Sequence, residues 1–189
     1  MLATVALALA PLPPGRVRPA SAADLDGVAL PDTWSAGGIA LRLNGIGLRT
    51  YSLFRVHIYV AALYLQQPSR DADAILHSDG VKLLVVRFLH DVNAQRAREA
   101  WLNGLHNSCQ PPCRLAEPIL RRFLAGVPDF HRGDASTLLF TVQTVAISVN
   151  GQPVGTIDDP QFSHAMLSNF IGAHPPSEAF KHGLLGLPQ

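Results

Sequence analysis

The chain of 189 residues is 48% hydrophobic and only 15% charged, and its formal net charge is +1. This length and apolar content fit one domain with a buried core, and the small net charge gives no reason to expect a nucleic-acid or strongly acidic partner. The fifteen glycines and fifteen prolines indicate many turns, as in a strand-rich fold.

The first residues carry the pattern of an export signal. Residues 2–12, LATVALALAPL, form an apolar run of the length of a signal-peptide core that is too short to span a bilayer, and the Ala-Ser-Ala at 20–22 offers a cleavage site. We therefore expect a signal peptide over 1–22, a single domain over 23–189, and a periplasmic or secreted protein. The alternative is a cytoplasmic protein with a disordered N-terminus. No later segment is apolar enough to predict a membrane helix in the mature chain.

Strands are expected to follow a loose lead-in over residues 23–38. Residues 39–52 alternate on both sides of Asn44-Gly45, a strong hairpin signal. Residues 54–65 then predict a long strand. Its even-numbered positions are apolar, which indicates a core face. Its odd-numbered positions begin polar and become apolar, a mix that suits a pocket wall or a partly covered sheet.

The middle of the chain predicts helices around one buried strand. We expect helices over 71–78, from Asn93 to about 106, and over 117–124, with Asn93 as an N-cap. Residues 81–89, VKLLVVRFL, are almost continuously apolar, which is typical of a strand buried on both faces.

The chain's two cysteines, Cys109 and Cys113, lie in the segment CQPPC. The Pro-Pro pair between them favours a bend. One such pair supplies only half of a zinc site, and a thioredoxin-like redox motif has a shorter spacing. We expect a structural disulfide if the protein is exported, and two reduced thiols if it is not.

The last third returns to strands and ends in helices. Residues 136–149 are rich in strand formers, and Asn150-Gly151 predicts a hairpin into the segment that follows. Residues 160–172 and 177–186 carry helix start and stop signals. The order of elements predicts an α+β fold with helices on one face of a mostly antiparallel sheet, and strict βαβ alternation is absent.

No standard catalytic or phosphate-binding motif occurs, and the scattered histidines predict no metal site. Arg49 is the residue that stands out. If the turn at Ser52-Leu53 is tight, Arg49 lies across from about His57 and shares a sheet face with Tyr59. A permanent cation beside a phenol suits a carboxylate, phenolate or enolate oxygen, with apolar neighbours covering the rest of the ligand. The alternative is a structural or partner-binding domain with Arg49 on its surface.

The segment around Arg49 resembles the chalcone isomerase family. The matching residues are Gly-x-Gly-x-Arg at 45–49, Leu-Tyr-Leu at 63–65, and RFLHDV at 87–92, which is similar to the family's His-Phe-Tyr-Arg-Asp-Ile. The later NGQPVGTI and LLG resemble the bacterial branch, and the resemblance covers about residues 35–186. It implies an open-faced β-sandwich in which a ligand cleft lies between a large antiparallel sheet and a layer of helices.

The resemblance also implies two functions, neither of which needs a cofactor. In the fatty-acid-binding relatives the matched arginine holds a carboxylate, and in the plant isomerases it polarises a ketone during ring closure. Here Arg49 matches that arginine, Tyr59 replaces a plant threonine, and Asn103 matches a plant asparagine, while Arg96 stands at the place of the catalytic tyrosine. We expect a protein that binds a small apolar carboxylate or phenolic ligand, of fatty-acid type, through Arg49, Tyr59 and Asn103. The alternative is a cofactor-independent isomerase, an intramolecular lyase, that acts on a phenolic or enone substrate with Arg49 as its catalytic residue.

Overall fold

A large antiparallel sheet organises the chain. The computed structural model describes residues 22–51 and 55–188, so the expected signal peptide lies almost wholly outside the described residues. Within them, seven strands pair in chain order, each antiparallel to the next. They are β3 (Thr33–Ala36), β4 (Ile39–Tyr51), β5 (Val56–Leu65), β6 (Lys82–Phe88), β7 (Ala135–Phe140), β8 (Thr144–Val149) and β9 (Gln152–Asp158). The expected antiparallel α+β architecture is confirmed.

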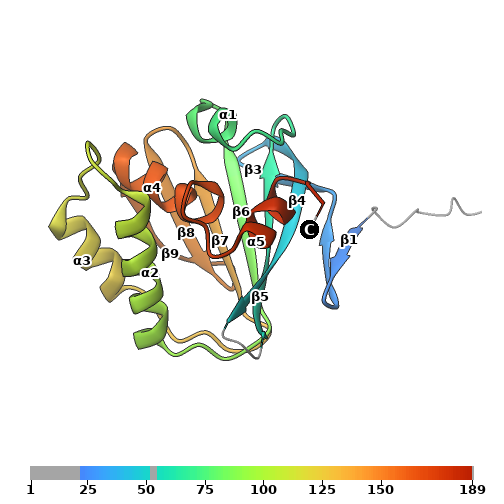
Figure 1. Cartoon of the computed structure of the whole chain (residues 1–189), viewed down its shortest axis with the longest axis horizontal. Coiled ribbons are helices and arrows are strands. Elements are labelled where there is room, and N and C mark those ends of the chain that lie inside the picture. The colour runs from blue at the N-terminus through green and yellow to red at the C-terminus, as the bar shows by residue number, and fades with distance from the viewer. Residues whose placement is uncertain (1–21, 52–54, 189) are drawn as a thin grey trace, which may run out of the picture.

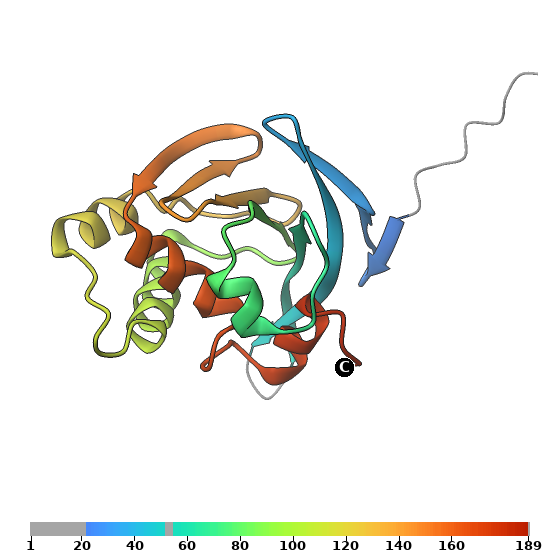
Figure 2. The same ribbon diagram turned by 90° about the horizontal axis from the view of Figure 1, so that it is seen from above.

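A layer of helices covers one face of this sheet, as Figures 1 and 2 show. The helices are α1 (Ala72–His77), α2 (Ala94–Ser108), α3 (Glu117–Ala125), α4 (Pro160–Ile171) and α5 (Glu178–Leu184). All were predicted, because each carries a local start signal. The Asn93 side chain, for example, accepts a hydrogen bond from the Arg96 backbone N–H at 2.9 Å. None of the described helices is long and apolar enough to cross a bilayer.

The main core lies between the sheet and the helices. On β5 it is formed by the odd-numbered side chains, including Ala61 and Leu63, which pack with Phe162, Met166 and Phe180 of the helical layer. The face that looked mixed in the sequence is therefore the principal core face. The even-numbered face of β5 is also buried, but under a smaller element.

That smaller element is a hairpin of β1 (Ala22–Leu25) and β2 (Val28–Pro31), and it corrects the expectation of a loose lead-in. Asp26 and Gly27 turn with positive φ values of 53° and 74°, as a tight hairpin requires. The hairpin contributes to a second apolar cluster on the opposite sheet face, where the Tyr64 hydroxyl donates to the Pro31 carbonyl at 2.9 Å. Asp-Gly is a hairpin signal that the sequence interpretation missed.

The hairpin predicted at Asn44-Gly45 is wrong, because β4 runs through these residues with only a bulge. The Asn44 amide is held by tertiary contacts: Nδ2 donates to the Leu184 carbonyl at 2.8 Å, and Oδ1 accepts from the Ser69 N–H at 2.7 Å. Gly45 and Gly47 lie where the backbone of α5 crosses the sheet, and a Cβ atom on Gly47 would lie 2.5 Å from the Phe180 carbonyl oxygen. The glycines therefore permit helix packing rather than a turn. The hairpin predicted at Asn150-Gly151 is confirmed, with φ values of 51° and 76°.

Candidate ligand-binding site

Arg49 is half-buried near the end of β4, beside the segment that joins α4 to α5. Its Nη1 donates to the Thr50 carbonyl at 2.9 Å and to the Pro176 carbonyl at 3.1 Å. Both acceptors are neutral. Among the described residues, no carboxylate forms an ion pair with Arg49. A half-buried guanidinium without a counter-charge is suited to receive an anion.

Tyr59 of β5 lies directly across the ladder from Arg49, which corrects the expected register. His57 faces Thr50 instead, because the ladder is irregular between Arg49 and Thr50. The Tyr59 ring packs edge-on against Phe88 and Phe180, with centroids 5.7 and 5.8 Å away. Burial raises the pKa of Tyr59 to about 12, although the Arg49 charge opposes this rise. At neutral pH the phenol is protonated with or without this shift, and its hydroxyl can donate a hydrogen bond.

An aromatic row leads from Tyr59 towards an apolar cavity. Phe88 stacks on Phe130, with ring centroids 4.2 Å apart and planes inclined by 11°. Phe130 also lines a cavity of about 40 Å³ whose other walls include Trp101 and Leu138. A cavity of this size holds on the order of one water molecule. The arginine is thus connected to the cavity through the successive contacts of Tyr59, Phe88 and Phe130.

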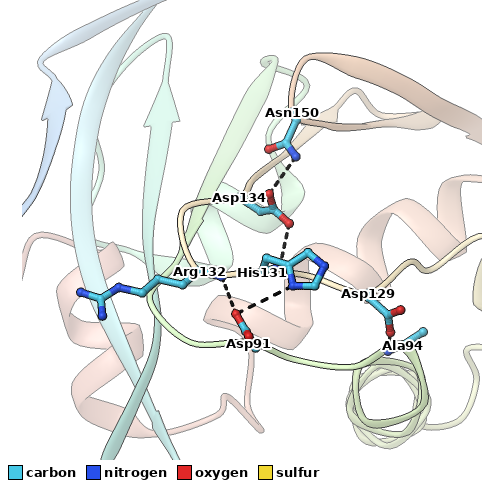
Figure 3. A network of polar contacts seen from close by, with 7 residues as sticks. All are labelled: Asp91, Ala94, Asp129, His131, Arg132, Asp134 and Asn150. Carbon is cyan, nitrogen blue, oxygen red and sulfur yellow. Dashed lines mark hydrogen bonds and ion pairs between the residues drawn. The ribbon is translucent and has the colours of Figure 1, made fainter.

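The loop that carries Phe130 is fixed by a polar network around Asp91 and Asp134 (Figure 3). Asp91 Oδ1 accepts from the Arg132 backbone N–H at 2.8 Å. Asp134 Oδ2 accepts from the His131 N–H at 2.7 Å, and its Oδ1 accepts from Asn150 Nδ2 at 2.9 Å. The hydrogen bond from the His131 backbone, and to a smaller extent that from Asn150, hold the pKa of Asp134 below its usual range.

The same network explains what the RFLHDV segment does in the structure. Val92 pairs with Phe130 through two backbone hydrogen bonds, of 2.8 and 2.9 Å, so the loop after β6 holds the loop before β7. Asp91 strengthens this junction and thereby keeps Phe130 stacked on Phe88. Sequence reasoning missed both phenylalanines as members of the site: the β5–β6 ladder places Phe88 opposite Tyr59, and the pairing of distant loops places Phe130.

The remaining residues that the sequence singled out lie elsewhere. Asn103 and Arg96 are exposed on α2, and no hydrogen bond among the described residues joins either side chain to Arg49 or Tyr59. The role of Asn103 in ligand binding stays a prediction. Cys109 and Cys113 form a disulfide in the loop between α2 and α3, with their Cα atoms 5.1 Å apart.

This architecture is similar to that of known proteins. A family model described as chalcone isomerase-like matches residues 22–186. No curated protein sequence matches the chain. Among solved structures, the crystal structure of a fatty-acid binding protein from Arabidopsis thaliana is similar, with a TM-score of 0.74 and 15% sequence identity. The match covers 87% of this chain and 96% of that one. At such low identity the likeness shows the fold alone.

Proposed function

The chain belongs to the chalcone isomerase-like family, and from this premise we propose that it binds a small apolar carboxylate of the fatty-acid type, with Arg49 as its anchor. The observation that carries the proposal is the state of Arg49. Its guanidinium is half-buried and bonded only to backbone carbonyls, so its charge lacks a partner among the described residues. A ligand carboxylate would supply that partner through charge-assisted hydrogen bonds.

The neighbours of Arg49 fit such a ligand. The Tyr59 hydroxyl would be the second donor, because Tyr59 lies directly across the ladder from Arg49 and a phenol is protonated at neutral pH. Phe88 and Phe130 would contact the apolar tail, which would point towards the small cavity beyond them. The similar Arabidopsis thaliana structure is that of a fatty-acid binding protein, which adds support at the level of the fold.

A long alkyl chain would need more room than these side chains leave. The cavity beyond Phe130 has a volume of about 40 Å³, and Phe88 and Phe130 stack between it and Tyr59. Binding would therefore require at least one aromatic ring to rotate. At Arg49 the two carbonyls are bonded to Nη1, and a guanidinium has five N–H donors, so a carboxylate could bond to it without displacing Pro176.

The isomerase alternative is not favoured. Ring closure on an enone calls for further polar groups around the arginine, and the two candidates on α2, Arg96 and Asn103, are exposed. An arginine that lies across the ladder from a partly buried phenol, with aromatic rings beyond it, is better suited to hold a carboxylate than to direct a reaction.

We also propose that the protein is exported to the periplasm or secreted, with cleavage after Ala22. The disulfide between Cys109 and Cys113 supports an oxidising compartment. Cleavage there would remove only the first residue of β1 and leave the β1–β2 hairpin paired from Ala23 onwards. The N-terminal sequence of protein recovered from the periplasmic fraction tests this, and an intact residue 1 in that protein would contradict it.

The binding proposal is tested with delipidated protein and dodecanoate, followed by isothermal titration calorimetry. Arg49→Ala should weaken binding by about 10- to 100-fold, because a hydrogen bond to a charged group contributes roughly 1.5–3 kcal/mol. Dodecan-1-ol, which has the same tail without the charge, should bind wild type no better than it binds the variant.

Arg42→Ala is the matched control, since Arg42 is an exposed arginine on the same strand. It should bind dodecanoate as wild type does. Equal affinities of wild type and Arg49→Ala would overturn the anchor role, and the absence of any dodecanoate binding would overturn the proposed function.

A further inference from the structure

A second cavity lies on the helical side of the sheet, between α1, α4 and the start of β6, and its volume is about 260 Å³. Its apolar surface comes from Leu76, Phe140 and Leu167. Its polar surface includes Lys82, His77 and His164, and the carboxylate of Asp79 also lines it. Neither Arg49 nor Tyr59 lines it, so it is separate from the site proposed above and does not depend on the proposed function.

Lys82 is the unusual residue of this cavity. It is the first residue of β6 and is only 4% exposed, on the strand face that also carries Leu84 and Val86 of the main core. Its Nζ donates to the Ser78 carbonyl at 2.6 Å and to the Gly80 carbonyl at 3.0 Å.

No anion neutralises this ammonium within the described part of the chain. The Asp79 carboxylate acts on it electrostatically but forms no ion pair. Loss of water around Nζ accordingly lowers the pKa of Lys82. Buried charges in proteins are ordinarily paired, because two neutral carbonyls do not replace a counter-ion. Lys82 therefore leaves positive charge at the wall of an open cavity.

Two histidines stand beside it. The rings of His77 and His164 have centroids 5.4 Å apart, although the residues are far apart in the chain. His77 Nδ1 lies 2.8 Å from the Asp73 carbonyl oxygen. Burial, and then the nearby His77 and Lys82, lower the pKa of His164, which indicates a positive potential in the cavity.

We propose that this cavity binds a small organic carboxylate, with its apolar body against Leu76, Phe140 and Leu167 and its carboxylate beside Lys82 Nζ and the His164 ring. The apolar surface favours a carboxylate with a hydrocarbon body over inorganic phosphate. The volume approaches the lower end of ordinary ligand pockets, about 300 Å³, so the ligand is short.

A metal ion fits the cavity less well than a carboxylate does. The described residues contain no group of three or more histidine, cysteine, aspartate or glutamate side chains that could hold one. The Lys82 ammonium would also repel a cation at this place.

The test is a titration of the isotope-labelled whole chain with hexanoate near pH 7, followed by amide and imidazole NMR signals. Saturable shifts are expected at α1, the start of β6 and the His77 and His164 rings. The His164 signal should also move towards its protonated position, because a bound carboxylate favours the charged form of a neighbouring imidazole. Hexan-1-ol, which has the same body without the charge, should bind at least about tenfold more weakly.

Lys82→Met keeps the length of the side chain and removes its charge, and it should weaken hexanoate binding by about tenfold or more. The control is Lys181→Met, which removes the chain's other lysine, whose Nζ donates to the Gly172 carbonyl at 2.8 Å and does not line the cavity. Its affinity for hexanoate should equal that of wild type. Equal binding of hexanoate and hexan-1-ol, unchanged affinity in a folded Lys82→Met, or the absence of saturable shifts near His77 and His164 would each overturn the proposal. If Lys82→Met does not fold, His164→Gln should weaken hexanoate binding in its place, and unchanged binding by that variant would overturn the proposal too.

Discussion

Replacement of Gly47 by alanine tests why helix α5 can lie directly on strand β4. A Cβ atom at this position would lie 2.5 Å from the Phe180 carbonyl oxygen and 3.0 Å from a carbon of its ring, whereas ordinary contacts begin at 3.4 Å. The first obstacle is helix backbone, which cannot rotate away as a side chain can. The added methyl group therefore requires α5 to move away from the sheet by about 0.9 Å, the difference between the 2.5 Å contact with the Phe180 carbonyl oxygen and an ordinary contact of 3.4 Å.

The cost of this movement follows from what α5 buries. Its Phe180 and Leu184 are both fully buried in the main core, and the Phe180 ring contacts Tyr59. Overpacking a well-packed core costs about 1–3 kcal/mol of unfolding free energy. For a domain of this size that corresponds to a fall in Tm of about 2–12 °C. Thermal and urea denaturation followed by circular dichroism measure both quantities.

Gly155→Ala provides the matched comparison. Gly155 also lies in a strand, β9, but a Cβ atom there would meet nothing within 4 Å. This variant should be as stable as wild type or more stable by about 0.5–1 kcal/mol, because glycine carries an entropic cost in a strand. If Gly47→Ala were as stable as wild type, or Gly155→Ala were destabilised equally, the steric explanation of the Gly-x-Gly sequence would be refuted.

Two further predictions concern stability. In the unfolded chain Tyr59 releases its proton near its ordinary pKa of 10.0, whereas the folded protein holds that proton to about 12, so the free energy of unfolding should fall as pH rises through this interval. Urea denaturation should be measured from about pH 9 to about pH 12. At about 1.36 kcal/mol per pKa unit, Tyr59→Phe should retain up to about 2.7 kcal/mol of unfolding free energy that wild type loses over this range. The similar shift of Tyr64 is common to both proteins, so an identical pH dependence of their unfolding free energies would contradict the prediction. The double variant Cys109→Ser, Cys113→Ser should lose about 2 kcal/mol of unfolding free energy. The loss is small because the two cysteines are only four positions apart in the sequence, and a disulfide that closes a short loop removes little entropy from the unfolded chain. Wild type in excess reductant should lose the same amount, and unchanged stability in either case would refute a structural role for the bond.

The secondary structure was largely predictable where its signals are local. The Asn93 cap and the Asn150-Gly151 turn were identified from a few residues and are present in the structure. The same Asn-Gly dipeptide at 44–45 lies in a continuous strand, because the amide of Asn44 bonds to Leu184 and Ser69 and the glycine admits α5. Propensity alone does not separate the two cases, because tertiary contacts determine the second.

The candidate site was predictable only in part. Arg49 and Tyr59 were identified from a family motif and strand alternation, and they do lie opposite each other. Their register was predicted incorrectly, because a local irregularity of the ladder shifts the pairing and has no clear sequence signature. Phe130 reaches the site only because a distant loop pairs with Val92. The pairing of His77 with His164 depends likewise on the packing of two helices.

The position of α5 in the chain has a consequence for the order in which the protein is completed during synthesis. Every strand of the large sheet pairs with its neighbour in sequence, so the sheet can grow as the ribosome extends the chain. The contacts of β4 with the end of the chain are different: Arg49 meets Pro176 across 127 positions, and Asn44 meets Leu184 across 140. A nascent chain that ends before these residues carries a sheet whose glycine surface is uncovered and whose anchoring arginine is unmasked. The segment that contacts the proposed anchor, Arg49, is therefore added only in the last stretch of translation.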